Sequence, residues 1–95
     1  MAKEFKIYVA GKHVEELNSA LLNRLNITGT TVIKARGYWF DNKIIVDEES
    51  TIIELITSVD VDVKTIGRII KDTIKDQDAV LVTEKPVSSN LYWLT

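Results

Sequence analysis

The sequence lacks several patterns, and each absence excludes a class of protein. It contains no cysteine, which excludes disulfides and thiolate metal sites. No apolar run approaches the ~20 residues that a membrane-spanning helix needs. Phosphate-binding loops, nucleophile elbows, catalytic-triad spacings and metal motifs are also absent. We therefore expect no cofactor, no metal and no membrane association.

A strong excess of basic residues is absent too. The formal net charge is −2, which disfavours a general nucleic-acid-binding protein. The charged residues Lys3, Glu4 and Lys6 interrupt the first apolar run, which is not the pattern of a secretory signal. We expect a soluble, cytoplasmic protein.

The residues that are present suit one folded domain. The chain has 95 residues, of which 45% are hydrophobic, so it can fill a real core. No linker, internal repeat or low-complexity segment divides it. We expect a single domain over residues 1–95, with a core at 4–84 and an apolar tail at 87–95.

A long β-hairpin is the most informative feature. Residues 30–40 are rich in β-branched and aromatic side chains, and a second such run extends from Lys43 to Thr57. Asp41 and Asn42 tolerate the positive φ of a two-residue turn, which predicts the turn there. Three successive carboxylates fit poorly in a regular strand, so we expect a bulge at residues 47–49.

A strand and a helix are predicted on each side of this hairpin. Residues 5–10 alternate as a strand, and a helix follows to about residue 26. The second helix is capped by Asp60 or Asp62, ends near Asp76, and precedes a strand at residues 79–83 that Pro86 stops. The buried stripes of the two helices are Val14, Leu17, Leu21 and Leu25, and Val63, Ile66, Ile70 and Ile74.

The order β-α-β-β-α-β predicts an α+β, ferredoxin-like fold. In this arrangement two helices cover one face of an antiparallel four-stranded sheet. The other face must be polar, bind something, or pack against another copy, so we expect a homo-oligomer, a dimer or larger. The apolar tail residues either form a fifth strand or dock into a neighbouring subunit at an interface. These residues are Leu91, Tyr92, Trp93 and Leu94.

Aromatic and basic residues before the hairpin turn are the first candidate site. Tyr38 and Trp39 can stack on a flat ring, with Arg36 beside them, or they can form a packed aromatic cluster. Together with KIYV at residues 6–9, this segment resembles the aromatic motifs of RNA-recognition domains. An extra strand stands between the motif and the second helix, which leaves RNA binding as an alternative.

Acidic residues and a histidine are the second candidate. Of Asp47, Glu48 and Glu49, only the first and third can share a side of a strand, where they serve acid–base chemistry or simply charge the edge. His13 lies between the first strand and helix, as an ordinary loop residue or as part of an anion site. A small hydrolase or isomerase built on Glu49 and His13 at a subunit interface is one hypothesis.

A basic stripe on the second helix is the third candidate. Its members, Lys64, Arg68, Lys71 and Lys75, fall within a narrow arc of the helix. Such a stripe can hold phosphates, or it can be the solvated face of an amphipathic helix. Gln77, which follows this helix, is a candidate for reading polar edges of a ligand.

Four short motifs occur in an order that resembles a known family. They are GTT at residues 29–31, GYW at 37–39, ESTII at 49–53 and QDAVLV at 77–82. The combination resembles an uncharacterised family of small proteins from bacteria and their phages. The resemblance implies a ferredoxin-like fold and an accessory gene, often carried by a phage or prophage. It supplies no catalytic residues.

Together these observations favour a non-enzymatic, phage-type accessory protein. As a homo-oligomer it would sequester a small phosphorylated, nucleotide-like ligand and so counter host defence. Tyr38 and Trp39 would stack the base, while Glu49 or Gln77 would read its polar edges. Arg36 and the cations Lys64, Arg68 and Lys71 would meet phosphate. The alternative is an inhibitor that docks a host protein through a sheet edge or the tail.

Overall fold

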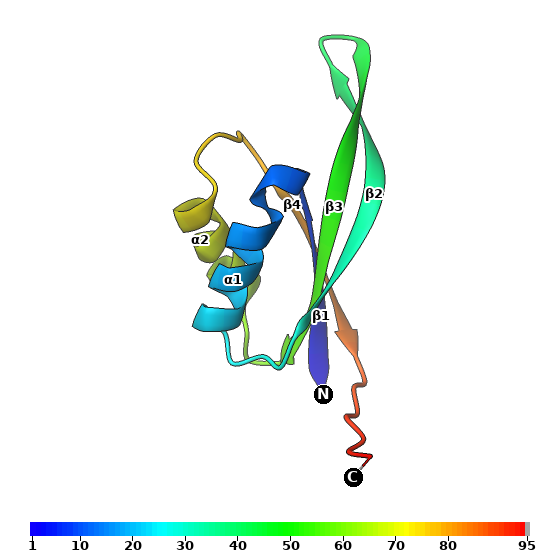
Figure 1. Cartoon of the computed structure of the whole chain (residues 1–95). Coiled ribbons are helices and arrows are strands. Elements are labelled where there is room, and N and C mark those ends of the chain that lie inside the picture. Colours follow the sequence, from blue (N-terminus) through cyan, green and yellow to red (C-terminus); the bar gives the residue numbers. More distant parts are fainter. Residues whose placement is uncertain (95) are drawn as a thin grey trace.

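The computed structural model describes residues 1–94, except for the side chain of Asp41. The elements follow the predicted order (Figure 1): β1 (Ala2–Val9), the short 3₁₀ turn η1 (Gly11–His13), α1 (Val14–Arg24), β2 (Thr30–Asp41), β3 (Ile44–Ser58), α2 (Val63–Thr73) and β4 (Leu81–Val87). Among these residues, no helix combines the length and apolar character that crossing a bilayer requires.

The four strands form one antiparallel sheet in the order β2-β3-β1-β4. Both helices lie against one face of it, and the opposite face carries no helix (Figure 1). This confirms the predicted ferredoxin-like α+β fold. We call the two sides of the sheet the helix-side face and the open face.

The core lies between the helices and the sheet. Alternation along β1 and β3 points every second residue toward the helices, and the helical stripes meet them. The predicted stripe of α1 is confirmed, while α2 also buries Ile69, and Val63 at its start is exposed. The side chain of Asp62 accepts a hydrogen bond from the Lys64 N–H, so Asp62 is the α2 cap. The buried apolar residues are Phe5, Ile7, Val9, Leu17, Leu21, Leu25, Ile53, Leu55, Ile66, Ile69, Ile70 and Ile74.

The hairpin turn lies one residue later than predicted. Asn42 and Lys43 have φ values of 49° and 67°, and Asp41 pairs with Ile44 across the strands. Two successive positive φ values define a type I′ turn, which follows the right-handed twist of the flanking strands. Lys43 adopts this conformation although its Cβ makes it unfavourable.

The predicted bulge at residues 47–49 is wrong. Tyr38 pairs with Asp47, Gly37 with Glu48 and Arg36 with Glu49 in unbroken register. Because β2 and β3 extend beyond β1 here, all three carboxylates are exposed. Regular pairing of the strands therefore buries no carboxylate. One of the three, Asp47, also forms an ion pair with Arg36, whose Nε lies 2.8 Å from Asp47 Oδ1.

The last strand and the tail also differ from the prediction. Pro86 does not stop β4 but lies within it, opposite Lys3. A proline is tolerated there because β4 is an edge strand. Residues 88–94 pair with no strand, and Leu91, Tyr92, Trp93 and Leu94 are 64–95% exposed. The fifth strand does not form in the described part of this single chain.

Candidate functional site

A two-stranded arm rises from the sheet beyond the helices (Figure 1). We define the arm as residues 36–49, where β2 and β3 pair only with each other, since β1 ends opposite Thr51. Its large apolar side chains are exposed: Tyr38, Trp39, Phe40, Ile44, Ile45 and Val46. A two-stranded ribbon is the least supported kind of sheet in water, so the arm is the least supported part of this sheet.

The two faces of the arm carry different residues. The register puts Tyr38 and Phe40 on the helix-side face and Trp39 on the open face. The predicted joint stacking of Tyr38 and Trp39 on one base is therefore wrong for a single chain. The Trp39 indole lies over Gly37, where an added Cβ would lie 3.1 Å from Nε1 and 3.6 Å from the Ser50 Cβ. The indole occupies the space that a side chain at position 37 would fill, so the ring lies toward Ser50 at the base of the arm.

The open face has an apolar row and a pocket. Ile33, Ile52, Tyr8 and Leu81 lie opposite one another in successive strands and cross the whole sheet. Beside this row is a pocket of about 750 Å³, which we call the open-face pocket. Its walls include Tyr8 and Leu81 and bring together two predicted site residues, Trp39 and Gln77.

Gln77 is unusual within the described residues because its Oε1 is buried and accepts no hydrogen bond from them. An unsatisfied buried acceptor costs about 1–3 kcal/mol, so it is a place where a donor from outside the chain would be stabilising. The residue lies after α2, where it lines the open-face pocket together with Asp78.

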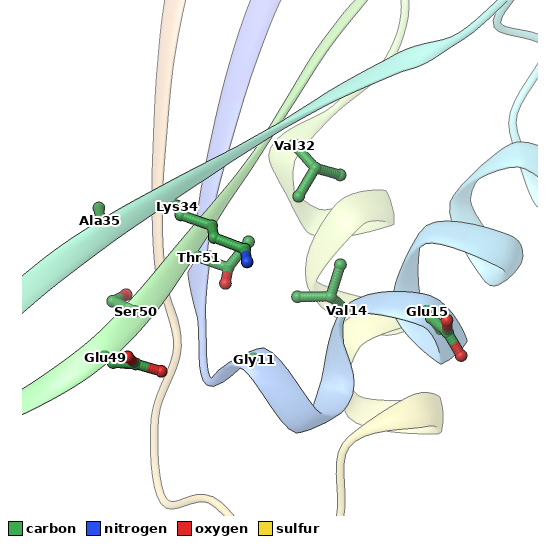
Figure 2. Close-up of a pocket in the computed structure, with 9 residues that line it drawn as sticks. All are labelled: Gly11, Val14, Glu15, Val32, Lys34, Ala35, Glu49, Ser50 and Thr51. Carbon is green, nitrogen blue, oxygen red and sulfur yellow. The ribbon is translucent and has the colours of Figure 1, made fainter.

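A second hollow lies on the helix-side face, between the start of α1 and the rising strands (Figure 2). We call it the helix-side cavity; its volume is about 450 Å³. Glu49 lines it, so the structure separates Glu49 from Trp39 and Gln77. The other lining residues are Gly11, Val14, Glu15, Val32, Lys34, Ala35, Ser50 and Thr51.

The remaining predicted site residues lie elsewhere. Arg36 is on the helix-side face of the arm, paired with Asp47. Lys64, Arg68 and Lys71 line a separate groove of about 300 Å³ on α2, where Gly67 leaves room between them. The structure thus divides the residues predicted for one site among the arm, the two pockets and this groove.

His13 takes part in a contact between the two helical segments. Its Nε2 lies 2.7 Å from Asp76 Oδ1, off the line of a hydrogen bond, while Lys12 Nζ donates to Asp76 Oδ2 at 2.8 Å. The Lys12 hydrogen bond, followed by the charge of His13, lowers the pKa of the exposed Asp76 carboxyl. His13 lines neither pocket, so a single chain does not bring it together with Glu49.

Metal binding finds no support in the described side chains. Leaving aside Asp41 and Thr95, no group of three or more His, Cys, Asp or Glu residues is placed to hold an ion.

Sequence reasoning missed the residues that shape both hollows. Lys34 stands two residues before Arg36, so strand alternation puts both on one face. Only the register shows that Lys34 lies diagonally across from Glu49 and that both line the same cavity. Tyr8 and Leu81 face each other through the β1–β4 pairing, which no local pattern reveals.

No protein-family model and no curated protein matches the sequence. Solved structures do match. The periplasmic divalent cation tolerance protein CutA from Archaeoglobus fulgidus has a TM-score of 0.80 at 11% identity, covering 96% of this chain and 88% of that one. Arabidopsis thaliana PII bound to citrate has a TM-score of 0.67 at 24% identity, with coverages of 92% and 78%. What these likenesses show is the fold.

A Bacillus cereus protein related to NIF3 matches with a TM-score of 0.78 at 19% identity. The match covers 93% of this chain but only 26% of that longer protein. The fold therefore also occurs as one part of a larger chain.

Proposed function

We propose that the protein is a non-enzymatic binding protein that works as a homo-oligomer and holds a small ligand. One observation carries the proposal: the arm exposes large apolar side chains on both of its faces. Burying such a side chain fully contributes about 1.5–3 kcal/mol. A second copy, which brings its own arm and its own open-face apolar row, covers this surface.

The open-face pocket is the proposed ligand site. Its volume of about 750 Å³ lies within the usual range of small-molecule pockets. Trp39 offers a ring on which a base can stack, and the Gln77 carboxamide lies in the same pocket. The base of the arm forms one wall, so assembly through the arm closes the site further.

A phosphorylated, nucleotide-like ligand is the finer part of the proposal. Base stacking on an aromatic ring contributes about 1–3 kcal/mol. The groove lined by Lys64, Arg68 and Lys71 supplies cations on α2 that can meet phosphate. The similar Arabidopsis PII structure contains citrate, a small polyanion, which is consistent with anion binding on this fold.

Calorimetry with a panel of cyclic di- and trinucleotides tests the ligand. We expect Trp39→Ala to weaken binding by roughly 5- to 150-fold, which corresponds to the loss of one stacked base. Trp93→Ala, which removes the other tryptophan from the exposed tail, is the matched control and should leave the affinity unchanged. Absence of heat with every nucleotide above micromolar affinity would remove the nucleotide version.

The accessory role in a phage or prophage remains a prediction that rests on the sequence resemblance. Purification from its host, followed by native mass spectrometry, would report the subunit number and any retained small molecule together.

A second candidate function is capture of a host protein. The exposed apolar tail favours it, as do the two edge strands β2 and β4. Deletion of residues 88–95 separates the two functions. Loss of partner capture with an intact oligomer would support this candidate, and unchanged capture would exclude the tail as the docking segment.

A further inference from the structure

The helix-side cavity holds charges of both signs that no described neighbour neutralises. Lys34 and Glu49 occupy diagonal positions on paired strands and project over Gly11, while Glu15 lies at the far rim (Figure 2). None of the three forms an ion pair within 4.0 Å with a described side chain. The Glu15 side chain points away from the other lining residues, so the cavity presents one free ammonium group, from Lys34, and one free carboxylate, from Glu49.

Two other charged residues near the cavity already form ion pairs. Arg36 is paired with Asp47 at 2.8 Å, and Lys12 with Asp76 at 2.8 Å. They leave Lys34 and Glu49 as the charged groups that face the hollow from the two strands. Because the uncommitted pair sits at the mouth of a defined cavity, a ligand can reach both groups at once.

The rest of the lining is apolar or hydroxylic. Val14 and Val32 form an aliphatic wall on the α1 side of the charges. Thr51, on the helix-side face, is only 7% exposed, and its hydroxyl makes no side-chain hydrogen bond within residues 1–94. The cavity thus offers an apolar surface flanked by hydrogen-bonding groups and opposite charges.

This lining discriminates between kinds of ligand. A phosphate would face the Glu49 carboxylate, and a metal ion would face the Lys34 ammonium group. A neutral apolar molecule would remove water from the charges without replacing its hydrogen bonds. A molecule with an ammonium and a carboxylate group, joined by a carbon that bears an apolar side chain, satisfies every part of the lining.

We propose that the helix-side cavity is a second ligand site, which binds a free α-amino acid with an aliphatic side chain. The Lys34 ammonium holds the ligand carboxylate, and the Glu49 carboxylate holds its ammonium group. Val14 and Val32 contact its side chain, and the Thr51 hydroxyl donates to its carboxylate. The site is independent of the nucleotide proposed for the open-face pocket.

Calorimetry of the full chain with L-leucine, L-valine and L-isoleucine tests this site. Two leucine derivatives provide controls on the ligand, because N-acetyl-L-leucine lacks the ammonium charge and L-leucinamide lacks the carboxylate. We expect each derivative to bind at least about tenfold more weakly than leucine, as loss of one charge-assisted hydrogen bond implies. Equal affinity for leucine and both derivatives would overturn the zwitterion assignment.

Two variants then connect each ligand group to its partner. Lys34→Met should weaken leucine at least about tenfold but leave leucinamide unaffected, because leucinamide has no carboxylate to lose. Glu49→Gln should weaken leucine and leave N-acetyl-leucine unaffected. The matched controls are Lys75→Met and Glu16→Gln, which change exposed charges outside the cavity.

The outcomes are separable from those of the nucleotide experiment. Leucine binding that Lys34→Met weakens and Trp39→Ala leaves intact supports the helix-side cavity, whether or not any nucleotide binds. No heat with any free amino acid at millimolar concentration would overturn the proposal. Equal losses from Lys34→Met and Lys75→Met would also overturn it, since a general charge effect would then explain the data.

Discussion

Replacing the apolar pair at the tip of the arm should dissociate the oligomer without unfolding the subunit. Phe40 and Ile45 are cross-strand partners on the helix-side face of the arm, and they are 75% and 67% exposed. The double variant Phe40→Lys, Ile45→Glu removes both apolar surfaces and puts opposite charges directly opposite each other. Such a pair supports the hairpin in the free subunit.

The expected effect follows from the exposed surface. Full burial of such a side chain contributes about 1.5–3 kcal/mol, so the exposed portion accounts for about 1–2 kcal/mol per residue and about 2–4 kcal/mol per pair. At 1.4 kcal/mol per tenfold, association weakens by roughly 30- to 700-fold for each pair that an interface buries. Burying the new charges would weaken it further.

Sedimentation velocity over a concentration series measures this change. The wild type should sediment as an oligomer and the double variant as a monomer, with matching circular dichroism spectra. Val59→Lys, which changes an exposed apolar residue in the turn before α2, is the control and should remain oligomeric. A wild type that is monomeric throughout the series, or a double variant that assembles as well as the wild type, would refute the argument.

Three further predictions concern the turn, the helix contact and the tail. Lys43→Gly should raise the free energy of unfolding in urea by about 0.5–1 kcal/mol, because the positive φ of 67° disfavours a residue with a Cβ; a decrease would contradict this view of the turn. The lowered pKa of Asp76 means that its stabilising contribution is present above the ordinary value of 3.8 and is lost as the pH falls through the lowered pKa. Asp76→Asn should therefore flatten this acidic part of the urea-measured stability curve, and an unchanged slope there would contradict the role of the contact. Deletion of residues 88–95 should change the free energy of unfolding by less than about 0.5 kcal/mol, since residues 88–94 join no strand; a larger loss would show that the tail packs on its own subunit.

Most of the fold could be predicted because local periodicity and tertiary packing agree. Leu17 and Leu21 on α1, and Ile66 and Ile70 on α2, recur at helical spacing and are all buried. The alternation along residues 50–56 separates Thr51, Ile53 and Leu55 from Ile52 and Ile56, but only the structure shows that the first set faces the helices. Where one face of a helix or strand is buried, its apolar residues recur on that face, and this period can be read from the sequence.

The site could be predicted only in part because it depends on register and on element length. The turn propensities of Asp41 and Asn42 do not distinguish a turn at residues 41–42 from one at residues 42–43. This difference of one residue changes every cross-strand pair of the hairpin. Tyr38 and Trp39 are adjacent in sequence, and for that reason they lie on opposite faces of β2. The sequence predicts one ligand site for the aromatic and basic residues because of their chemical type. The fold places these side chains on different faces of the sheet and on α2.

Apart from the exposed tail, the arm is where several departures from local rules occur together, and this bears on function. Lys43 has a positive φ, and large apolar residues lie exposed on both faces. Three consecutive carboxylates occupy a regular strand beside them. After Thr51, β3 pairs with β1 as well and buries Ile53 and Leu55 toward the helices. Natural sequences depart from consistent patterning mainly where function requires it. The exposed apolar residues of the arm therefore favour it as the surface of the proposed assembly.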